Sequence, residues 1–427
     1  MILFYRIFTT VLYPFLFLLI YLRMIFKKED PVRYKEKILI SQFNASKKIS
    51  QKLIWFHAAS LGEFKSIIPI INDLNKKHKN LKFLITTTTL SSGNLANIEL
   101  RRFKNAEHRY LPYDVPFLIN NFLDLWKPNK IFLVDSEIWP NLILKTKELN
   151  IPIALLNARL TPKTFKRWML FPKTAKKIFS IFDLCICSSN ETKTNLEKLE
   201  LKKVYFRGNI KLINQLDNHE IKNINENILL KKRFWFAAST HKEEEIFCLK
   251  THLKIKEKYK DIVTIIAPRH INRTSKIQSL TKKFNLNAQL LKKNEKILND
   301  KEIIIIDHYG VLQNYFKFAK SVFIGKSIIK RLQNDGGQNP LEAARLNCKI
   351  YHGPYVYNFE EIYKILEANN ISKKIENLED LSKNLIEDLK NPTKRKNQNS
   401  QSINNLAEKT LADNMKLIEN FISDEVI

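Results

Sequence analysis

Residues 336–344 read Gly-Gly-Gln-Asn-Pro-Leu-Glu-Ala-Ala, a stretch that is typical of a tight turn leading into a helix. The two glycines let the backbone approach a ligand closely, and Pro340 suits a first helical turn, where its missing N–H costs nothing. Free N–H groups and the positive end of the helix dipole favour an anion there. Glu342 either complements that dipole or accepts hydrogen bonds from a ribose. A plain glycine loop is the alternative, and the rest of the chain decides between the two.

Working outward from this stretch, apolar runs alternate with longer amphipathic runs, which is the pattern of α/β domains. With 427 residues the chain is too long for one ordinary domain, so two or three are expected. The first predicted domain covers residues 40–210, and Leu61–Lys77 has the apolar spacing of its first helix. Its predicted strands are Leu53–Ala58, Leu81–Thr86, Ile131–Asp135, Pro152–Asn157, Leu184–Cys187 and Lys203–Phe206.

The same rhythm restarts after a polar, Asn-rich segment and predicts a second doubly wound domain over residues 230–395. Residues 396–427 are expected to form one more amphipathic helix, from about Ser402 to Ile422. The strands predicted in the second domain are Arg233–Ala238, Ile262–Ala267, Glu302–Ile306, Ser321–Gly325 and Cys348–His352. Its predicted helices are His241–Tyr259, Gly310–Ala319, Pro340–Leu346 and Asn358–Ala368.

The N-terminal residues 1–28 are predicted to be a membrane anchor helix. Ile2–Phe26 is mostly apolar, with Arg6 and Arg23 as its only charges and Pro14 near its middle. About 20 apolar residues span a bilayer, so the segment is marginally long enough. Lysines and arginines follow at once, and the positive-inside rule then keeps the main body in the cytoplasm. A helix lying in the membrane interface is the alternative.

The composition favours an anionic partner without naming it. Lys and Arg total 72 against 43 Asp and Glu, which gives a net charge of +29 and a pI near 9.7. Such a field attracts phosphates, anionic lipid or nucleic acid, although codon bias in an AT-rich genome would also enrich Lys, Asn and Ile. The four cysteines lie in or beside apolar runs, and Cys185-x-Cys187 lacks the second pair of a zinc site. Reduced, buried thiols suit the cytosol.

Polar residues follow the predicted strands, at the sheet edge where open α/β sheets bind ligands. Ser60, Gly62 and Glu63 come after the first strand. Gly62 permits a tight turn, and the Glu63 carboxylate can take a proton from a hydroxyl or merely complement a helix dipole. Glu137 brings a second carboxylate to the same edge, with N-capping by Asp135 or Ser136 as the alternative interpretation of that segment.

In the second domain, four segments at successive strand ends together favour an anionic nucleotide site. Arg269 suits bidentate phosphate binding, while the hydroxyls of Ser239 and Thr240 either cap a helix or bind an anion. The segments are Ser239-Thr240-His241, Pro268-Arg269-His270, Tyr309-Gly310 and the opening stretch. A phosphate loop and an early G-x-G-x-x-G are absent, which disfavours ATPases and dehydrogenases. No metal-binding motif appears, so no built-in metal is expected.

Taken in order, these motifs resemble the Kdo transferases, the 3-deoxy-D-manno-octulosonic acid transferases of lipopolysaccharide synthesis. The resemblance covers nearly the whole chain. It is carried by the anchor, His57–Glu63, Asp135–Asn141, Asn157–Leu160, Gly208–Lys211, Ser239–His241, Pro268–His270 and Asn339–Glu342.

The resemblance implies a GT-B fold, in which two doubly wound Rossmann-like domains face a cleft and the last helix commonly crosses back to the first domain. It also implies a metal-independent, inverting transferase without a cofactor. The donor would be CMP-Kdo, and the acceptor the 6′-hydroxyl of the lipid A precursor, lipid IVA. The enzyme would lie at the inner membrane, with its catalytic domains on the cytoplasmic face.

The resemblance further assigns roles to individual residues. Glu63 matches the proton acceptor, and Glu137 a second acidic residue of the active site. The segments that match CMP contacts are Pro268 and Arg269, then Tyr309, Gly310 and Val311, then Asn339, Pro340, Leu341 and Glu342. Candidate anion or sugar contacts are Ser60, Gly62, Arg159, Lys211, Ser239, Thr240 and His241.

The chain departs from the family pattern around the nucleotide pocket. Val311 stands where the family usually has Glu, and Lys326 stands in place of a glycine. Gln338 replaces a usual His, Asp135 a usual Glu, and the segment between Ser327 and Gly336 is longer than typical. Glu63 and Arg269 keep the family's residues, so the reaction type is expected to survive.

Two other functions are alternatives. One is a GT-B enzyme that uses a UDP-sugar on another membrane lipid. The other is a basic, membrane-anchored binding protein for nucleic acid or anionic lipid, which would need basic and aromatic residues interleaved along one element. The charges here are spread along the whole chain, so a nucleic-acid partner is not expected.

Overall fold

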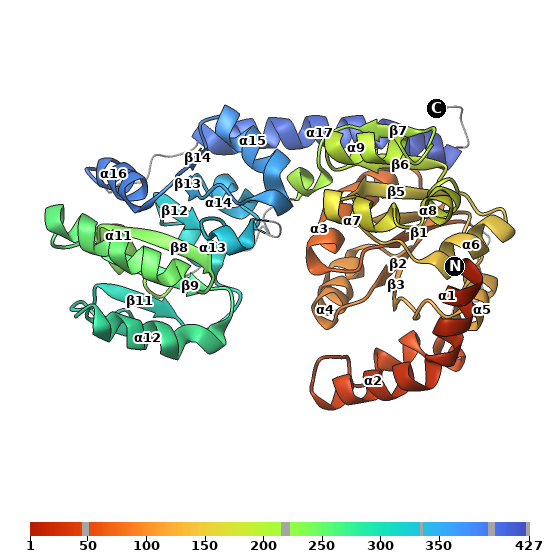
Figure 1. The fold of residues 1–427 in the computed structure, drawn as a ribbon, viewed down its shortest axis with the longest axis horizontal. Coiled ribbons are helices and arrows are strands. Elements are labelled where there is room, and N and C mark those ends of the chain that lie inside the picture. The colour runs from red at the N-terminus through yellow and green to blue at the C-terminus, as the bar shows by residue number, and fades with distance from the viewer. Residues whose placement is uncertain (45–50, 215–222, 334–335, 392–397, 424–427) are drawn as a thin grey trace. The chain divides into compact units, whose positions relative to one another are not determined.

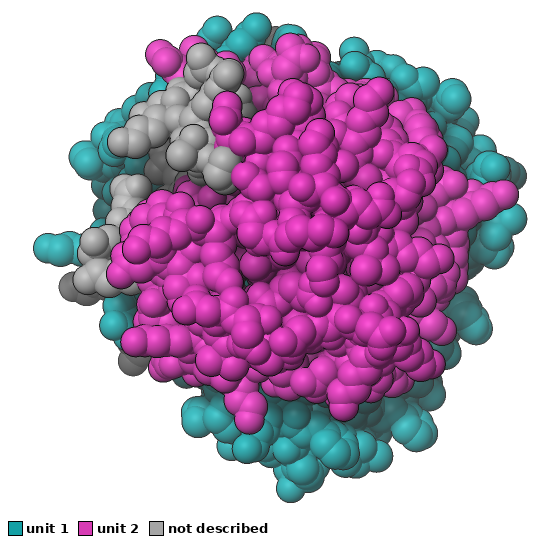
Figure 2. All heavy atoms as spheres, turned by 90° about the vertical axis from the view of Figure 1, so that its left-hand side faces the viewer, with its two compact units in different colours: residues 1–215, 407–427 teal, residues 216–406 magenta. Residues whose placement is uncertain are grey.

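The structure, a computed structural model, describes residues 1–44, 51–214, 223–333, 336–391 and 398–423. The chain forms two compact units (Figure 2). Unit 1 comprises residues 1–215 and 407–427, and unit 2 comprises residues 216–406. The predicted boundary between residues 395 and 396 lies outside the described residues.

Unit 1 is a parallel seven-stranded sheet with helices on both faces (Figure 1). Its strands are β1 Lys52–His57, β2 Leu81–Thr87, β3 Ala106–Tyr110, β4 Lys130–Val134, β5 Ile153–Ala158, β6 Leu184–Cys187 and β7 Val204–Phe206, in the order β3-β2-β1-β4-β5-β6-β7. One face packs against α3 Leu61–Lys77, α4 Leu90–Glu99 and the end of α17 Gln398–Ser423. The other packs against α5 Pro116–Trp126, α6 Pro140–Glu148, α8 Pro172–Phe179 and α9 Asn190–Glu197.

Unit 2 repeats this architecture with a second parallel seven-stranded sheet in the order β10-β11-β9-β8-β12-β13-β14. Its strands are β8 Phe234–Thr240, β9 Val263–Pro268, β10 Ala288–Leu291, β11 Ile303–Ile306, β12 Ser321–Ile324, β13 Lys349–His352 and β14 Ser372–Lys374. Its main helices are α11 Glu244–Lys258, α12 Thr274–Lys283, α13 Leu312–Phe316, α14 Leu341–Arg345, α15 Glu360–Ala368 and α16 Leu378–Asp388. The predicted pair of doubly wound α/β folds is therefore confirmed.

The strands that the sequence did not predict, β3, β10 and β14, all lie at sheet edges. Their sequences, Ala-Glu-His-Arg-Tyr, Ala-Gln-Leu-Leu and Ser-Lys-Lys, contain no long apolar run. Central strands of a parallel sheet are buried on both faces, whereas edge strands are partly solvated, so the apolar pattern is weaker at the edges, where only β7 was predicted. The four helices predicted in the second domain are all shorter than expected. The largest differences are in α11, which begins at Glu244 rather than His241, and in α13, which covers only Leu312–Phe316.

The N-terminal apolar segment is two helices rather than the single helix that was predicted. α1 Ile2–Val11 and α2 Tyr13–Ile25 meet at an angle of 55°. Pro14 lies in the first turn of α2, where its ring is tolerated but interrupts the hydrogen bonding of a continuous helix. Among the described residues no single helix is long and apolar enough to cross a membrane. The two helices of this bent pair together have the length and composition to do so.

One side of the helix pair contacts unit 1, and the other exposes apolar side chains. The Tyr5 hydroxyl donates to Asp114 at 3.0 Å, and the Tyr13 hydroxyl donates to the Ile38 carbonyl at 2.9 Å. Ile20 is fully buried against Tyr34 and Ile38. The exposed apolar side chains include Leu3, Phe4, Ile7, Phe15, Leu18, Leu22 and Phe26. The pair is thus an integral part of unit 1 with one unpartnered apolar side.

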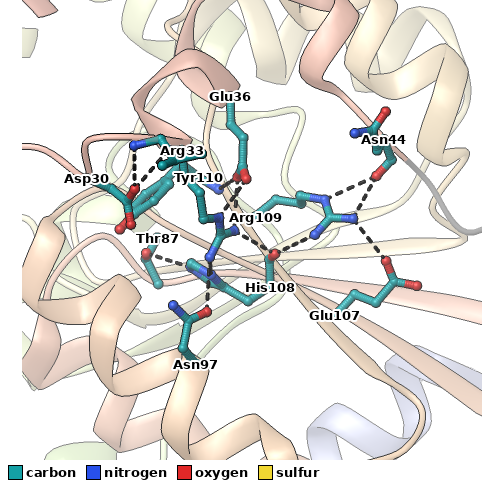
Figure 3. Close-up of polar contacts among 11 residues, drawn as sticks. Asp30, Arg33, Glu36, Asn44, Thr87, Asn97, Glu107, His108, Arg109 and Tyr110 are labelled. Carbon is teal, nitrogen blue, oxygen red and sulfur yellow. Dashed lines mark hydrogen bonds and ion pairs between the residues drawn. The ribbon is translucent and has the colours of Figure 1, made fainter.

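The residues that follow the pair cover the edge strand β3 (Figure 3). The Arg33 guanidinium pairs with Glu36 and donates to the His108 carbonyl at 2.9 Å, while Glu36 accepts the Tyr110 N–H at 2.9 Å. Burial, and then the charge of Arg33, lowers the pKa of His108 to about 3. A neutral His108 can therefore accept from Arg33 and donate to the Thr87 hydroxyl. These bonds satisfy an edge that would otherwise be open to pairing.

Asp114 joins α1 to the start of α6. Its buried carboxylate accepts the N–H groups of Asn141 and Leu142, both at 2.9 Å, besides the Tyr5 hydroxyl. It therefore acts as a cap for α6, although it precedes that helix by some 25 residues of chain. Burial raises the pKa of Asp114 to about 6, against the lowering effect of these hydrogen bonds.

We expect Asp114→Ala to destabilise the protein by roughly 2–5 kcal/mol, because two buried N–H groups at the start of α6 lose their acceptor. Chemical denaturation followed by circular dichroism measures the change. The folded pKa exceeds the unfolded value of about 3.9, so the native state binds more protons between those two values. The stability that wild type gains from this group therefore increases as the pH falls from about 6 to about 4, and Asp114→Ala loses that gain.

Asp124→Ala provides the matched control, because Asp124 is exposed on α5 and its loss should change stability by less than about 0.5 kcal/mol. Equal stabilities of the Asp114 and Asp124 variants would contradict the capping role of Asp114.

Candidate functional site

The carboxyl ends of three adjacent strands of unit 1 bring together the polar residues predicted from its sequence. β1 pairs with β4, and β4 pairs with β5, all in parallel. The segments Ala59–Glu63, Asp135–Glu137 and Asn157–Arg159 therefore leave the sheet at one edge. This edge is where open parallel sheets place their ligands.

Glu63 opens α3 in a capping box. The Ser60 hydroxyl accepts the Glu63 N–H and donates to Glu63 Oε1 at 2.7 Å, while Glu63 Oε2 accepts the N–H of Ala59 at 2.8 Å and of Ser60 at 3.4 Å. The helix-start alternative is thus a real structural role of this residue. A carboxylate offers about four lone-pair sites, of which three are used here. One acceptor site, on Oε1, remains.

The surroundings of Glu63 favour its protonated form. Burial raises the pKa of Glu63, and the negative charges of Asp135 and Glu137 raise it further. The Ser60 hydrogen bond and the Lys211 charge act in the opposite direction. The carboxylate therefore holds a proton more readily than an exposed glutamate does, which is the property that a general base needs near neutral pH.

Glu137 is oriented by a chain of buried polar groups. Its Oε2 accepts the Trp139 indole N–H at 2.7 Å and lies 3.2 Å from His57 Nε2. The other ring nitrogen of His57 lies 2.9 Å from the Thr86 hydroxyl, which itself accepts the Trp55 indole N–H. His57 Nδ1 also lies 3.2 Å from the Thr86 carbonyl oxygen. Because an ionised carboxylate only accepts hydrogen bonds, His57 Nε2 is the nitrogen that donates to Glu137.

Asp135 and Lys211 form a partly buried ion pair beside these carboxylates. The Lys211 ammonium lies 2.5 Å from Asp135 Oδ2, and the Asn157 side-chain amide donates to Asp135 Oδ1. Asp135 and Asn157 both adopt left-handed backbone conformations, with φ of 61° and 56°. Such strain persists only where the surroundings impose it, and it is common at functional sites. The alternative of Asp135 as N-cap is wrong, because α6 begins at Pro140 and Asp114 supplies its acceptor.

The remaining predicted residues of unit 1 differ in their roles. The Arg159 N–H donates to the Asp135 carbonyl, and the Arg159 carbonyl accepts from the Ser136 hydroxyl, so Arg159 is held at the edge. Gly62 lies within the first turn of α3 rather than in a turn before it. A Cβ there would meet nothing within 4 Å, so neither the turn nor the packing requires glycine.

In unit 2, Arg269 and His241 lie at neighbouring strand ends. Arg269 follows β9 with an exposed side chain, and its N–H donates to the Thr240 carbonyl at the end of β8. The rings of His241 and His270 meet edge to face at 5.7 Å, and Gln338 Nε2 lies 3.4 Å from His241 Nε2. The structure therefore brings the segments after β8 and β9 together with the glycine-rich stretch of residues 336–344.

A buried carboxylate holds the loop after β12 against the end of β8. Glu244 accepts four backbone N–H groups, those of His241, Lys326, Ser327 and Ile328. Burial raises the pKa of Glu244 in spite of these bonds. α11 therefore begins with Glu244 turned inward, and the expectation that Ser239 or Thr240 caps that helix is wrong. Sequence reasoning missed Glu244 because it lies in the charged run Lys242–Glu245, which resembles a solvated helix start.

Packing and backbone conformation, and not only ligand contact, require the two glycines of residues 336–344. A Cβ on Gly336 would lie 2.1 Å from the Tyr355 carbonyl oxygen, and Gly337 has a φ of 94°. α14 is only five residues long, so its dipole is weak. The side chains of Pro340 and Leu341 are buried in unit 2, which leaves Asn339 and Glu342 as the more accessible predicted contacts.

The third segment of unit 2, after β11, has an exposed aromatic ring. The Tyr309 side chain is 60% exposed, and its hydroxyl accepts the Ile271 N–H at 3.4 Å, which places it beside the Arg269 segment. Gly310 has a φ of 82°, a conformation that favours glycine, and Val311 precedes the first residue of α13. Within the described ranges, no group of three or more His, Cys, Asp or Glu side chains could hold a metal ion.

Comparisons with known proteins identify the family of the chain. Residues 33–214 match the family described as 3-Deoxy-D-manno-octulosonic-acid transferase (kdotransferase). A relative in Arabidopsis thaliana, named "Probable 3-deoxy-D-manno-octulosonic acid transferase, mitochondrial", is 34% identical over 331 residues, covering 74% of this chain and 72% of the relative. The 3-deoxy-D-manno-octulosonic acid transferase of Rickettsia typhi is 30% identical over 424 residues, covering 89% of this chain and 90% of the relative.

A solved structure supports the fold alone. A glycosyltransferase from Rickettsia africae superimposes with a TM-score of 0.58 at 13% identity, covering 87% of this chain and 99% of that chain. This likeness is too distant in sequence to carry over individual residues.

We expect the charges of Asp135 and Lys211 to shift the pKa of Glu63 in opposite directions. Asp135→Asn removes a nearby negative charge and should lower the pKa of Glu63, whereas Lys211→Gln removes a positive charge and should raise it. Carbon-13 NMR titration of labelled glutamate carboxyls measures both shifts, with the Glu63 signal assigned from Glu63→Gln.

Asp183→Asn serves as the control, since Asp183 caps the start of β5 and is not among the charges that act on Glu63. Shifts of the same sign in the Asp135 and Lys211 variants would contradict the electrostatic coupling.

Proposed function

Because the chain belongs to the 3-deoxy-D-manno-octulosonic acid (Kdo) transferase family, we propose that it transfers Kdo from CMP-Kdo to the 6′-hydroxyl of the lipid A precursor, lipid IVA. The transfer inverts the anomeric centre and needs no metal, with Glu63 as the general base. The observation that carries this proposal is the half-buried Glu63 carboxylate, which keeps one free acceptor site at the carboxyl edge of the unit 1 sheet.

Glu63 is suited to remove the proton from the acceptor hydroxyl. Its raised pKa brings it closer to neutral pH, and the capping box fixes its rotamer before substrate arrives. As the hydroxyl oxygen attacks the anomeric carbon of Kdo, its proton passes to Glu63, and the bond to the CMP phosphate oxygen breaks on the opposite face. This single displacement inverts the configuration. A positioned base of this kind contributes roughly 10²–10⁴-fold to the rate.

Glu137, Asp135 and Lys211 support that step. Glu137 is held by His57 and Trp139, and it is proposed to orient the acceptor sugar at the same edge. The Asp135 charge raises the pKa of Glu63, and the smaller, opposite effect of the Lys211 charge limits that rise. Ser60 and Arg159 lie beside these groups and are proposed as further sugar or anion contacts.

Unit 2 is proposed to hold CMP-Kdo. The exposed Arg269 guanidinium suits the CMP phosphate, because its planar donors match phosphate oxygens. Tyr309 to Val311 and Asn339 to Glu342 are proposed to contact the nucleoside, with Glu342 at the ribose. Ser239, Thr240 and His241 stand next to Arg269, where they are proposed to meet the sugar or the phosphate.

The helix pair is proposed to attach the enzyme to the cytoplasmic face of the inner membrane. One side of the pair is fixed to unit 1, and the other exposes a row of apolar side chains. The bend and the one-sided exposure favour helices that lie in the membrane interface over a straight span.

Family membership favours this function over the two alternatives. Competition of CMP against UDP for binding separates it from a transferase that uses a UDP-sugar. Salt-sensitive oligonucleotide binding without transfer would instead support a binding protein.

Incubation of the detergent-solubilised protein with CMP-Kdo and lipid IVA should yield an acceptor that is heavier by Kdo, measured by mass spectrometry. Glu63→Gln should lower turnover at least about a hundredfold, while CMP affinity stays nearly unchanged. Glutamine at this position still completes a capping box, so the fold is preserved.

Glu191→Gln is the matched control, because Glu191 is an exposed first-turn carboxylate of α9. Its turnover should stay within roughly twofold of wild type, because a surface substitution away from the site is nearly neutral. Near-normal turnover of Glu63→Gln would remove Glu63 from the role of base.

We expect Arg269→Ala to weaken CMP binding at least about tenfold, since a charge-assisted bidentate contact is lost. Isothermal titration calorimetry with CMP and with UDP measures the effect. Lys276→Ala removes an exposed positive charge on the nearby α12 and should leave CMP affinity unchanged. If both variants lost the same amount of CMP affinity, Arg269 would act only by general electrostatic attraction and not by a specific contact.

A further inference from the structure

Unit 1 contains a cavity of about 180 Å³ at the carboxyl ends of β4 and β5. The cavity lies between the strand ends, α9 and the hairpin formed by α7 Pro162–Trp168 and α8. One side is polar and comes from Asp135, Ser136 and Arg159, the same residues that border the Glu63 site. The cavity thus adjoins the proposed acceptor site without being part of the Glu63 contacts.

The deeper walls of the cavity are apolar. Leu155 of β5 and Leu160, two residues beyond that strand, close it on one side, and the Trp168 and Phe179 rings meet edge to face at 5.3 Å on the helical side. The polar side chains have partners already: Asp135 pairs with Lys211, and Ser136 donates to the Arg159 carbonyl. Protein interiors leave few voids of this size, and one of 150 Å³ with apolar walls stays dry and holds benzene. The walls therefore suit hydrocarbon rather than a sugar.

The segment beside the cavity is apolar, exposed and surrounded by positive charge. Met169, Leu170 and Phe171 directly follow Trp168, and Leu170 is 72% exposed. The basic residues around them are Lys163, Lys166, Arg167 and Lys173. Exposed apolar side chains among basic ones suit the surface of anionic lipid, where they contact both acyl chains and phosphates.

The hairpin also lies on the same side of unit 1 as the helix pair. Trp168 and Phe165 pack against the hydrophobic cluster on the α5 and α6 face of the sheet. Ile2, Tyr13 and Leu16 of the helix pair pack against that same cluster. A lipid that reaches the helix pair therefore meets the hairpin on the same face of the sheet.

We propose that this cavity receives the terminal methylenes of one acyl chain of the lipid acceptor, whose anionic head group stays at the polar rim beside Arg159. This inference rests on the proposed function, since it names a subsite for the same acceptor. Binding there places the acceptor by its hydrocarbon as well as by its sugar, and it distinguishes acylated from deacylated acceptors.

The first test uses a probe that needs no transfer. 11-Bromoundecyl phosphate, kept below its micelle concentration, carries a bromine that quenches tryptophan fluorescence on contact. The full chain should show saturable quenching that is lost in Trp168→Phe. Thr164→Phe fills the cavity from its rim and should lower the affinity for the probe about tenfold, the loss expected when two methylenes are excluded from the cavity.

Thr174→Phe is the matched control, because Thr174 lies on α8 and does not line the cavity. It should bind the probe as wild type does. Ile138→Phe fills the same cavity from another segment and should behave as Thr164→Phe does, so misfolding of one variant leaves the test standing. Equal quenching in Thr164→Phe and Thr174→Phe, or quenching that does not saturate, would overturn the proposal.

The second test compares lipid IVA with its O-deacylated form as acceptors. Wild type should show a higher kcat/KM for lipid IVA, and Thr164→Phe should lose about tenfold on lipid IVA while keeping its rate on the deacylated form. An unchanged ratio in Thr164→Phe would overturn the acyl subsite although the transferase stands. Absence of transfer by wild type, with saturable quenching intact, would overturn the proposed function but not the hydrocarbon cavity.

Discussion

The ion pair between the buried Asp135 and the half-buried Lys211 is the interaction on which the carboxyl edge of unit 1 depends. A buried charge is tolerated only when it is paired and hydrogen-bonded, and Asp135 meets both conditions through Lys211 and Asn157. Asn157 in turn accepts the Ile210 N–H at 3.1 Å, so the ends of β4 and β5 are bound to the segment that follows β7. Two strained residues are held in place by this set of bonds, and the charge balance around Glu63 follows from it.

Unit 2 uses a single carboxylate for a comparable purpose. Glu244 gathers four N–H groups and holds the Lys326–Ile328 loop against the end of β8. Lys326 has a φ of 60°, a conformation that costs a side chain more than it costs glycine. The hydrogen bonds to Glu244 offset that cost. They explain how a lysine can stand at this position, where the family resemblance leads one to expect glycine.

Much of this fold could be predicted from the sequence, because buried parallel strands and amphipathic helices leave regular apolar patterns. Edge strands such as β3 and β14 escaped prediction, since their solvated sides carry polar residues. The site shows the same division. Glu63 and Arg269 could be proposed because they lie in segments that follow strands, whereas Glu244 and His57 act through contacts with residues far away in the chain. The distant acceptor that Asp114 provides for α6 leaves no local signal either.

The long helix α17 contributes to both units: residues up to 406 are counted with unit 2, and residues from 407 with unit 1. Met415, Ile418 and Phe421 belong to the hydrophobic cluster on the α3 face of the unit 1 sheet. Thr410 and Asn414 also lie against Arg207 and Gly208, next to the segment that ends in Lys211. A ribosome therefore releases the strands of unit 1 long before the helix that completes their core. During synthesis unit 1 therefore has to wait, with one face of its sheet uncovered, for residues that emerge only after the strands of unit 2.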